Sequence, residues 1–124
     1  EEPMRDHTKL KAFGLADRLV LETYNVTRRF PEEERFGLCS QMRRAAVSIG
    51  TNIVEAAARP SQGEYLRLLS VAYSSAKELQ YEISIAARLN YLDPDAEKDL
   101  SRHALETSKA LWALIAAIRR AGSR

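Results

Sequence analysis

Four prolines divide this chain into long stretches that lack proline. They are Pro3, Pro31, Pro60 and Pro94, and the stretches between them contain few glycines and carry apolar residues at helical spacing. Because proline lacks a backbone donor and clashes with the preceding turn, it ends a helix or stands in its first turn. The spacing therefore predicts four helices, over about residues 8–30, 33–58, 62–90 and 94–121.

The connections between these predicted helices are only a few residues long. Short connections force helices that follow each other in the sequence to run antiparallel. No stretch alternates polar and apolar residues with a period of two, so we expect no sheet. The 124 residues are enough for one domain with a single core. We expect an all-α protein, a single up-down-up-down four-helix bundle that spans residues 1–124.

Two helix starts carry clear capping signals. Ser61 and Glu64 form an S-x-x-E capping box ahead of the third helix. Asp93 followed by Pro94 is typical of a helix start, with the aspartate as N-cap. The third helix carries residues at steps of four and three, the spacing of helices packed nearly parallel to their neighbours. This core stripe consists of Tyr65, Leu69, Ala72, Ala76, Leu79, Ile83, Ala86 and Asn90.

The second predicted helix is apolar over a wider arc than one bundle needs. Its core face consists of Leu38, Met42, Ala45, Ile49, Ile53 and Ala56. Val47, Val54 and Ala58 lie on a different side. A helix that is apolar around most of its circumference is buried around most of it. We therefore expect part of this surface to contact another subunit.

The remaining arc of the second helix is a polar stripe. Serine and asparagine, which it contains, are poor choices for a freely solvated helix interior. We interpret the stripe as a solvated or interhelical polar seam that fixes subunit register, with a ligand-binding stripe as the alternative. Arg43 points away from the stripe, and we expect it to contact either another subunit or a phosphate. The members of the stripe are Gln41, Arg44, Ser48, Asn52, Glu55 and Arg59.

Few residues could carry catalysis. His103 lies between Asp99 and Glu106, and for it a solvated helix face is favoured over a weak metal site. His7 lies in the amino-terminal segment. Cys39 has no histidine or second cysteine near it in the sequence, so it is interpreted as a small buried residue. We expect no enzymatic activity, no metal and no cofactor.

The single cysteine gives no sign of an oxidising compartment. The most apolar stretch, residues 110–118, is about half as long as the roughly 20 residues of a membrane-spanning helix. The amino end does not resemble a signal peptide. We therefore expect a cytoplasmic protein that does not enter a membrane.

The formal net charge of +2 hides an uneven distribution. In an antiparallel bundle, the start of the first helix shares one end with the ends of the second and fourth. The cations at that end are Lys9, Lys11, Arg59, Arg119, Arg120 and Arg124. All of them except Arg124 are candidate phosphate contacts. Cations at helix carboxyl ends also complement the helix dipole, which is the alternative explanation. At the opposite end, Arg28, Arg29 and Arg35 lie among the glutamates 32–34, where we expect local ion pairing.

A set of residues between positions 30 and 79 matches a known family pattern. It comprises Phe30-Pro31, Glu34, Phe36-Gly37-Leu38, Gln41, Arg43-Arg44-Ala45, Ser48-Ile49, Asn52-Ile53 and Glu55, followed by Glu64-Tyr65, Ala72, Ser75 and Glu78-Leu79. With this pattern, the chain resembles the bacterial 23S rRNA intervening-sequence proteins over about residues 13–120. It departs from the family at Gly50, where proline is common, and at Ala56, where glycine is common.

The resemblance implies a four-helix bundle in a ring-like homo-oligomer, commonly a pentamer, with no established activity. Some members are encoded inside insertions in large-subunit ribosomal RNA genes. A group with a similar fold, the accessory variability protein of diversity-generating retroelements, binds a reverse transcriptase and nucleic acid. We therefore expect a non-enzymatic homo-oligomeric adaptor for RNA or DNA. The alternative is a scaffold that recognises a protein partner, such as a reverse transcriptase, and has no role with nucleic acid.

Overall fold

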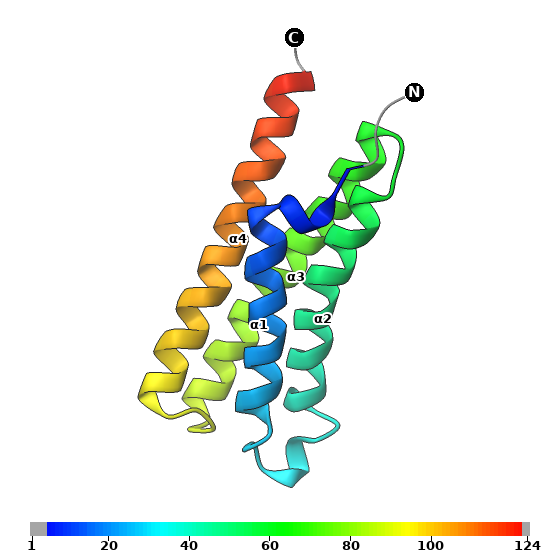
Figure 1. The fold of residues 1–124 in the computed structure, drawn as a ribbon. Helices are drawn as coiled ribbons and strands as arrows, with labels where there is room; N and C mark the ends of the chain where they lie inside the picture. The colour runs from blue at the N-terminus through cyan, green and yellow to red at the C-terminus, as the bar shows by residue number, and fades with distance from the viewer. Residues whose placement is uncertain (1–4, 123–124) are drawn as a thin grey trace.

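The computed structural model describes residues 5–122, in which four long α-helices are joined by short segments (Figure 1). The helices are α1 (Lys11–Thr27), α2 (Leu38–Ala57), α3 (Gln62–Arg88) and α4 (Pro94–Gly122), and the 3-10 turns are η1 (His7–Lys9) and η2 (Glu32–Glu34). No strand is present in this part of the chain, so the predicted all-α class is confirmed. None of these helices is both long enough and apolar enough to cross a membrane.

Each helix packs against its two neighbours around the bundle. α2 contacts α1 and α3, and α4 contacts the same two helices. No close backbone contact joins α1 to α3 or α2 to α4 within residues 5–122. Successive helices run in opposite directions (Figure 1). The predicted up-down-up-down four-helix bundle is therefore confirmed.

The core consists of the inward-facing stripe of each helix. The face predicted for α2 lies in this core, apart from Leu38, which is half-buried at the first position of the helix. Burial of one Leu or Ile side chain contributes about 1.5–3 kcal/mol, so these stripes hold the helices together. The least exposed large apolar side chains are Leu19, Met42, Ile49, Ile53, Leu69, Leu79, Ile83, Leu100 and Leu111.

Side-chain caps begin α3 and α4 where the sequence predicts them. The Ser61 hydroxyl oxygen accepts a hydrogen bond from the Glu64 backbone amide at 3.1 Å. The Asp93 carboxylate accepts one from the Ala96 amide at 2.9 Å. Each cap satisfies an amide that has no partner inside its own helix, and this fixes where the helix begins.

The second helix begins at Leu38, later than the predicted residue 33. Pro31 is followed by a 3-10 turn, and Gly37 adopts φ −106° and ψ −114°, outside the helical region. The Glu34 carboxylate accepts a hydrogen bond from the Leu38 amide at 3.0 Å and so caps α2. The predicted start is wrong because this cap overrides the helix propensity of the glutamates. The first helix is also shorter than the predicted 8–30. His7–Lys9 form a separate 3-10 turn before it, and Pro31 disfavours a helical conformation at Phe30.

Asn90 ends α3 and does not extend its core stripe. Its φ is 63°, the left-handed conformation that glycine and asparagine adopt most readily. The Asn90 amide donates to the Ala87 carbonyl at 3.0 Å, and the Tyr91 amide donates to the Ala86 carbonyl at 2.9 Å. These are the two bonds of a Schellman motif. The prediction that Asn90 lies in the buried stripe is wrong, since its side chain is exposed, whereas the other members of the stripe are buried.

Replacement of Asn90 tests this helix ending. We predict that Asn90→Ala lowers the free energy of unfolding by about 1 kcal/mol, because alanine is strained in the left-handed region. Asn90→Gly keeps or raises stability, since glycine lacks this strain. Urea unfolding followed by circular dichroism measures both variants. Equal losses in the two would contradict the role assigned to the backbone conformation.

Candidate functional site

The predicted basic end is built from segments that are far apart in the sequence. The start of α1 and the ends of α2 and α4 lie at the same end of the bundle, the upper end in Figure 1. The last turn of α4 lies close to the first turn of α3, since a Cβ at Gly122 would be 3.0 Å from Nε2 of Gln62. Arg124 lies outside the described residues. The exposed cations carried by these segments are Lys9, Lys11, Arg59, Arg119 and Arg120.

Arg5 adds a further cation that is not among those predicted for the basic end. Its Nη1 donates a hydrogen bond to the Arg59 carbonyl at 2.6 Å, and its guanidinium carbon lies 4.1 Å from the centre of the Tyr65 ring. A cation over an aromatic face is attracted by the quadrupole of the ring. These contacts hold the amino-terminal segment against the connection between α2 and α3. Arg5 precedes the first helix, so no periodicity in the sequence could reveal it.

Carboxylates dilute the positive charge of the basic end. Asp6 accepts hydrogen bonds from the hydroxyl and the amide of Thr8, and these bonds lower the pKa of Asp6 below its ordinary value. Asp6 is therefore ionised at neutral pH. Glu64 lies in the first turn of α3, and Glu106 lines a groove between α1 and α4 together with Lys109. Cations outnumber carboxylates at this end, but the surface is mixed.

The middle of the polar stripe joins α2 to α3 within the chain. The hydroxyls of Ser48 and Ser75 lie 2.8 Å apart and share a hydrogen bond. The Asn52 amide nitrogen donates to the Ser48 carbonyl at 2.8 Å and to the Ser48 hydroxyl at 3.0 Å. This part of the stripe is an interhelical seam, and its role in subunit register stays a prediction. The other members of the stripe are exposed: Gln41, Arg44, Glu55 and Arg59.

A buried carboxylate lies along the same helix pair. Glu82 follows Ser75 by about two helical turns and lies on the same face of α3. Glu82 is only 7% exposed, and its Oε1 has no hydrogen-bond partner within residues 5–122. Burial, and secondarily the charge of Glu78, raises the pKa of Glu82 from its ordinary 4.5 to about 7. Glu82 was not among the predicted site residues, although its position beside the core stripe was an available signal.

The outer face of α2 exposes apolar side chains. Val47 is 42% exposed and Val54 is 37% exposed. A shallow hollow of about 490 Å³ lies beside Val47 and is lined in part by Tyr24 of α1. Arg44 and Glu55 also line it, so opposite charges accompany the apolar side chains. The term outer face of α2 here means the surface formed by Val47, Val54, Arg44 and Glu55.

Arg43 is engaged inside the chain. Its Nε donates to the Thr27 hydroxyl at 2.9 Å, and its Nη2 donates to the Tyr24 carbonyl at 3.4 Å. Its guanidinium carbon also lies 4.6 Å from the centre of the Tyr24 ring. Arg43 therefore joins α2 to the end of α1. The two predicted assignments of Arg43 were a contact with another subunit and a contact with a phosphate. Neither of them is this contact within the chain.

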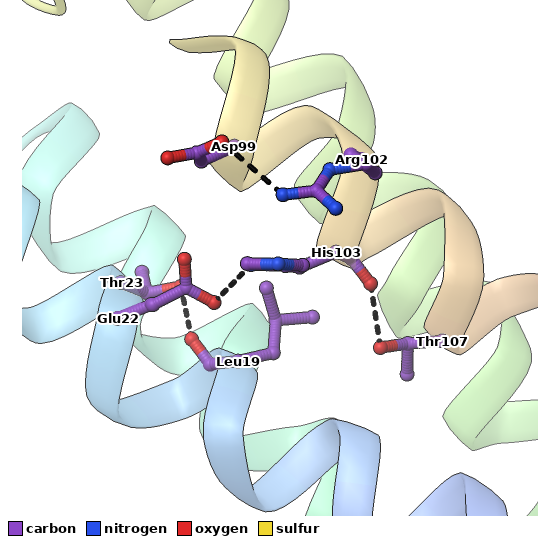
Figure 2. Close-up of polar contacts among 7 residues, drawn as sticks. All are labelled: Leu19, Glu22, Thr23, Asp99, Arg102, His103 and Thr107. Carbon is purple, nitrogen blue, oxygen red and sulfur yellow. Dashed lines mark hydrogen bonds and ion pairs between the residues drawn. The ribbon is translucent and has the colours of Figure 1, made fainter. Parts of the chain in front are cut away.

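His103 links α4 to α1 (Figure 2). Its Nδ1 lies 2.6 Å from Oε1 of Glu22, and its side chain is 16% exposed. Asp99, one turn before it, forms a separate ion pair with Arg102 at 3.2 Å. The prediction of a solvated face is wrong for His103, because the sequence does not show which residue of another helix lies opposite. Within residues 5–122, no group of three or more His, Cys, Asp or Glu side chains is placed to hold a metal ion.

Residues 8–113 match the family model described as 23S rRNA-intervening sequence protein. The chain is also similar to a solved structure, a protein of unknown function from the S23 ribosomal protein family of Bacteroides thetaiotaomicron. The two are 23% identical with a TM-score of 0.79, and the match covers 84% of this chain and 97% of that one. This likeness shows a shared fold. No curated protein matches the chain significantly.

The raised pKa of Glu82 predicts a pH-dependent stability. Between pH 4.5 and about 7, the folded chain holds a proton that the unfolded chain has lost, so stability falls as pH rises through this window. At about 1.36 kcal/mol per pKa unit, the loss due to Glu82 is roughly 3 kcal/mol. We predict that Glu82→Gln removes this loss and is more stable than the parent above the window, with little difference below it.

Urea unfolding of the parent and of Glu82→Gln from about pH 4 to about pH 8 measures the effect. Glu78→Gln is the matched control, because Glu78 is exposed on the same helix one turn away. This control changes the pH profile much less. If the free energy of unfolding of Glu82→Gln depends on pH in the same way as that of the parent, the carboxyl of Glu82 does not have a raised pKa.

Proposed function

This chain belongs to the 23S rRNA-intervening sequence protein family, and from that premise we propose that it is a non-enzymatic, homo-oligomeric adaptor that binds RNA or DNA. The basic end is the contact surface. The observation that carries the proposal is the gathering of cations from three separate segments at one end of the bundle. The residues that contact phosphates are Lys9, Lys11, Arg59, Arg119 and Arg120.

Such a surface binds the backbone of a nucleic acid and does not read its bases. Phosphate contacts position a protein on the nucleic acid but carry no sequence information. Each neutralised phosphate releases counterions, so affinity grows with the number of contacts and falls as salt rises. Asp6 and Glu64 weaken the field of a single subunit. A symmetric oligomer offsets this dilution, because it repeats the basic end in every subunit.

The outer face of α2 is the contact between subunits. Val47 and Val54 are exposed in the single chain, and burial of such side chains is favourable. Arg44 and Glu55 carry opposite charges on this face, so each can pair with a residue of opposite charge on another subunit. When this face meets a different surface of the next subunit, the contact is head-to-tail. Head-to-tail contacts that close form a ring. The family resemblance favours a pentamer.

The placement of the reactive side chains supports a role without catalysis. His103 is paired with Glu22, so its imidazole is committed to a contact between helices. Cys39 is buried, as predicted, and its thiol lies 3.8 Å from the Thr27 carbonyl, which is not a base that could activate it. A catalytic site needs a nucleophile or base next to a space for the reacting atom. A thiol without an adjacent base is not an activated nucleophile.

Charge reversal at the basic end tests the nucleic-acid role. We predict that Arg119→Glu with Arg120→Glu weakens binding to structured RNA or duplex DNA at least about tenfold, by a similar factor for different base sequences. Lys98→Glu with Arg102→Glu makes the same charge change near the other end of α4. This matched control leaves affinity within about twofold. Fluorescence anisotropy across a salt series measures both variants.

Two results would count against nucleic-acid binding by the parent protein. One is the absence of binding at low salt, and the other is binding that does not weaken as salt rises. Either result would favour the alternative, a scaffold for a protein partner such as a reverse transcriptase.

Charge placed on the outer face of α2 tests the subunit contact. We predict that Val47→Glu with Val54→Glu reduces the mass in light scattering to that of one chain, because the new carboxylates would be buried without partners. Leu105→Glu, at a similarly exposed apolar residue of α4, leaves the mass unchanged. Circular dichroism checks that both variants keep their helices. A monomeric parent, or a double variant of parental mass, would exclude this face as the contact.

A further inference from the structure

A second cluster of cations lies at the end of the bundle opposite the basic end. Arg28 follows α1, Arg35 follows η2, and Arg43 lies in the first half of α2. All three line one hollow of about 370 Å³. They come from three different segments, so the fold brings these three side chains to one hollow. The other lining residues are Thr27, Phe30, Pro31, Glu32 and Cys39.

The arginines of the hollow form no close ion pair with the neighbouring glutamates within residues 5–122. The predicted pairing of Arg28, Arg29 and Arg35 with the glutamates 32–34 is wrong, because no carboxylate within residues 5–122 lies within 4.0 Å of their side-chain nitrogens. Glu34 instead caps α2 and accepts a hydrogen bond from a tyrosine hydroxyl of the α3–α4 connection at 2.8 Å. Both bonds lower the pKa of Glu34, with the α2 amide as the larger cause. Glu32 therefore offsets only part of the arginine charge, and the remainder is available to a ligand.

Contacts within the chain fix the inner wall of the hollow without a ligand. The Thr27 hydroxyl and the Tyr24 ring hold the partly buried guanidinium of Arg43 in place. The buried Cys39 thiol lies 3.8 Å from the Thr27 carbonyl and closes the wall. A fixed arginine fork loses less entropy on binding than a mobile one. α2 begins at Leu38, so the positive end of its dipole also faces this end of the bundle.

We propose that this hollow binds the dianionic phosphate group of a small phosphate monoester. Its three guanidinium groups and the Glu32 carboxylate give a formal charge of +2, which balances a dianion. Arginine donates paired hydrogen bonds to phosphate oxygens. A phosphate ester presents three acceptor oxygens to donors from three segments, whereas a planar carboxylate presents two. The volume lies in the range of small-molecule sites, so the attached organic group also fits.

Calorimetric titration of the parent protein tests the site. We expect inorganic phosphate and a nucleoside monophosphate to bind, and the corresponding nucleoside, which lacks the phosphate, not to bind. Arg28→Gln and Arg35→Gln each weaken binding at least about tenfold, because each removes a guanidinium from the lining. Arg29→Gln is the matched control, since Arg29 is exposed in the same segment but does not line the hollow. It changes affinity less than about twofold.

Four results would overturn the proposal. They are no binding of either phosphate compound, the same loss in the control as in the lining variants, equal binding of acetate, and loss of phosphate binding on charge reversal at Arg119 and Arg120. The last would assign the bound phosphate to the basic end. Circular dichroism verifies that each variant keeps its helices, and Arg43 is left unchanged because it joins α1 to α2.

Discussion

The antiparallel order of four helices around one apolar core is the constraint on which the other features depend. Each helix buries one stripe, and the short connections leave no other order for successive helices. That order decides which charged residues share an end of the bundle. The basic end and the arginine-lined hollow both follow from it, since each combines segments that no local motif brings together.

Polar contacts between helices then set how far each helix is displaced along its neighbour. Ser48 with Ser75 joins α2 to α3, His103 with Glu22 joins α4 to α1, and Arg43 joins α2 to α1. An apolar stripe with a regular repeat packs almost equally well after a shift of one repeat, whereas a hydrogen bond between particular partners does not survive that shift. The core provides most of the stability, and these contacts select the register. The register in turn places Glu82 where its carboxyl is buried.

Much of the fold was predictable because its signals are local. Proline spacing, the caps at Ser61 and Asp93, and the apolar stripes each act within a few residues. The errors involve partners from other helices or a special backbone conformation. Glu34 moves the start of α2, Asn90 leaves the core stripe because of its positive φ, and His103 meets a carboxylate from another helix. A sequence shows which residues share a face but not which residue lies across from them.

The candidate sites also differ in whether local signals or contacts with other helices determine them. The basic end was predictable from helix order alone, because a cation near a helix terminus stays at that end of the bundle. The hollow was missed because ion pairing with adjacent glutamates was the simplest local interpretation, and a tertiary contact of Glu34 removes one of them. The two surfaces also differ in chemistry. Lysine contributes to the basic end, whereas arginine alone supplies the cations of the hollow.

This difference in side chains separates the two proposed ligands. Lysine is a hydrated point charge that tolerates many phosphate positions, which fits an extended polyanion lying across several helix ends. Arginine is a planar fork that requires a particular geometry, which fits one phosphate in a concave site. The 27 residues of α3 put about 40 Å between the two ends of the bundle. A small phosphate ester cannot span that distance, so its binding in the hollow leaves the basic end free for nucleic acid.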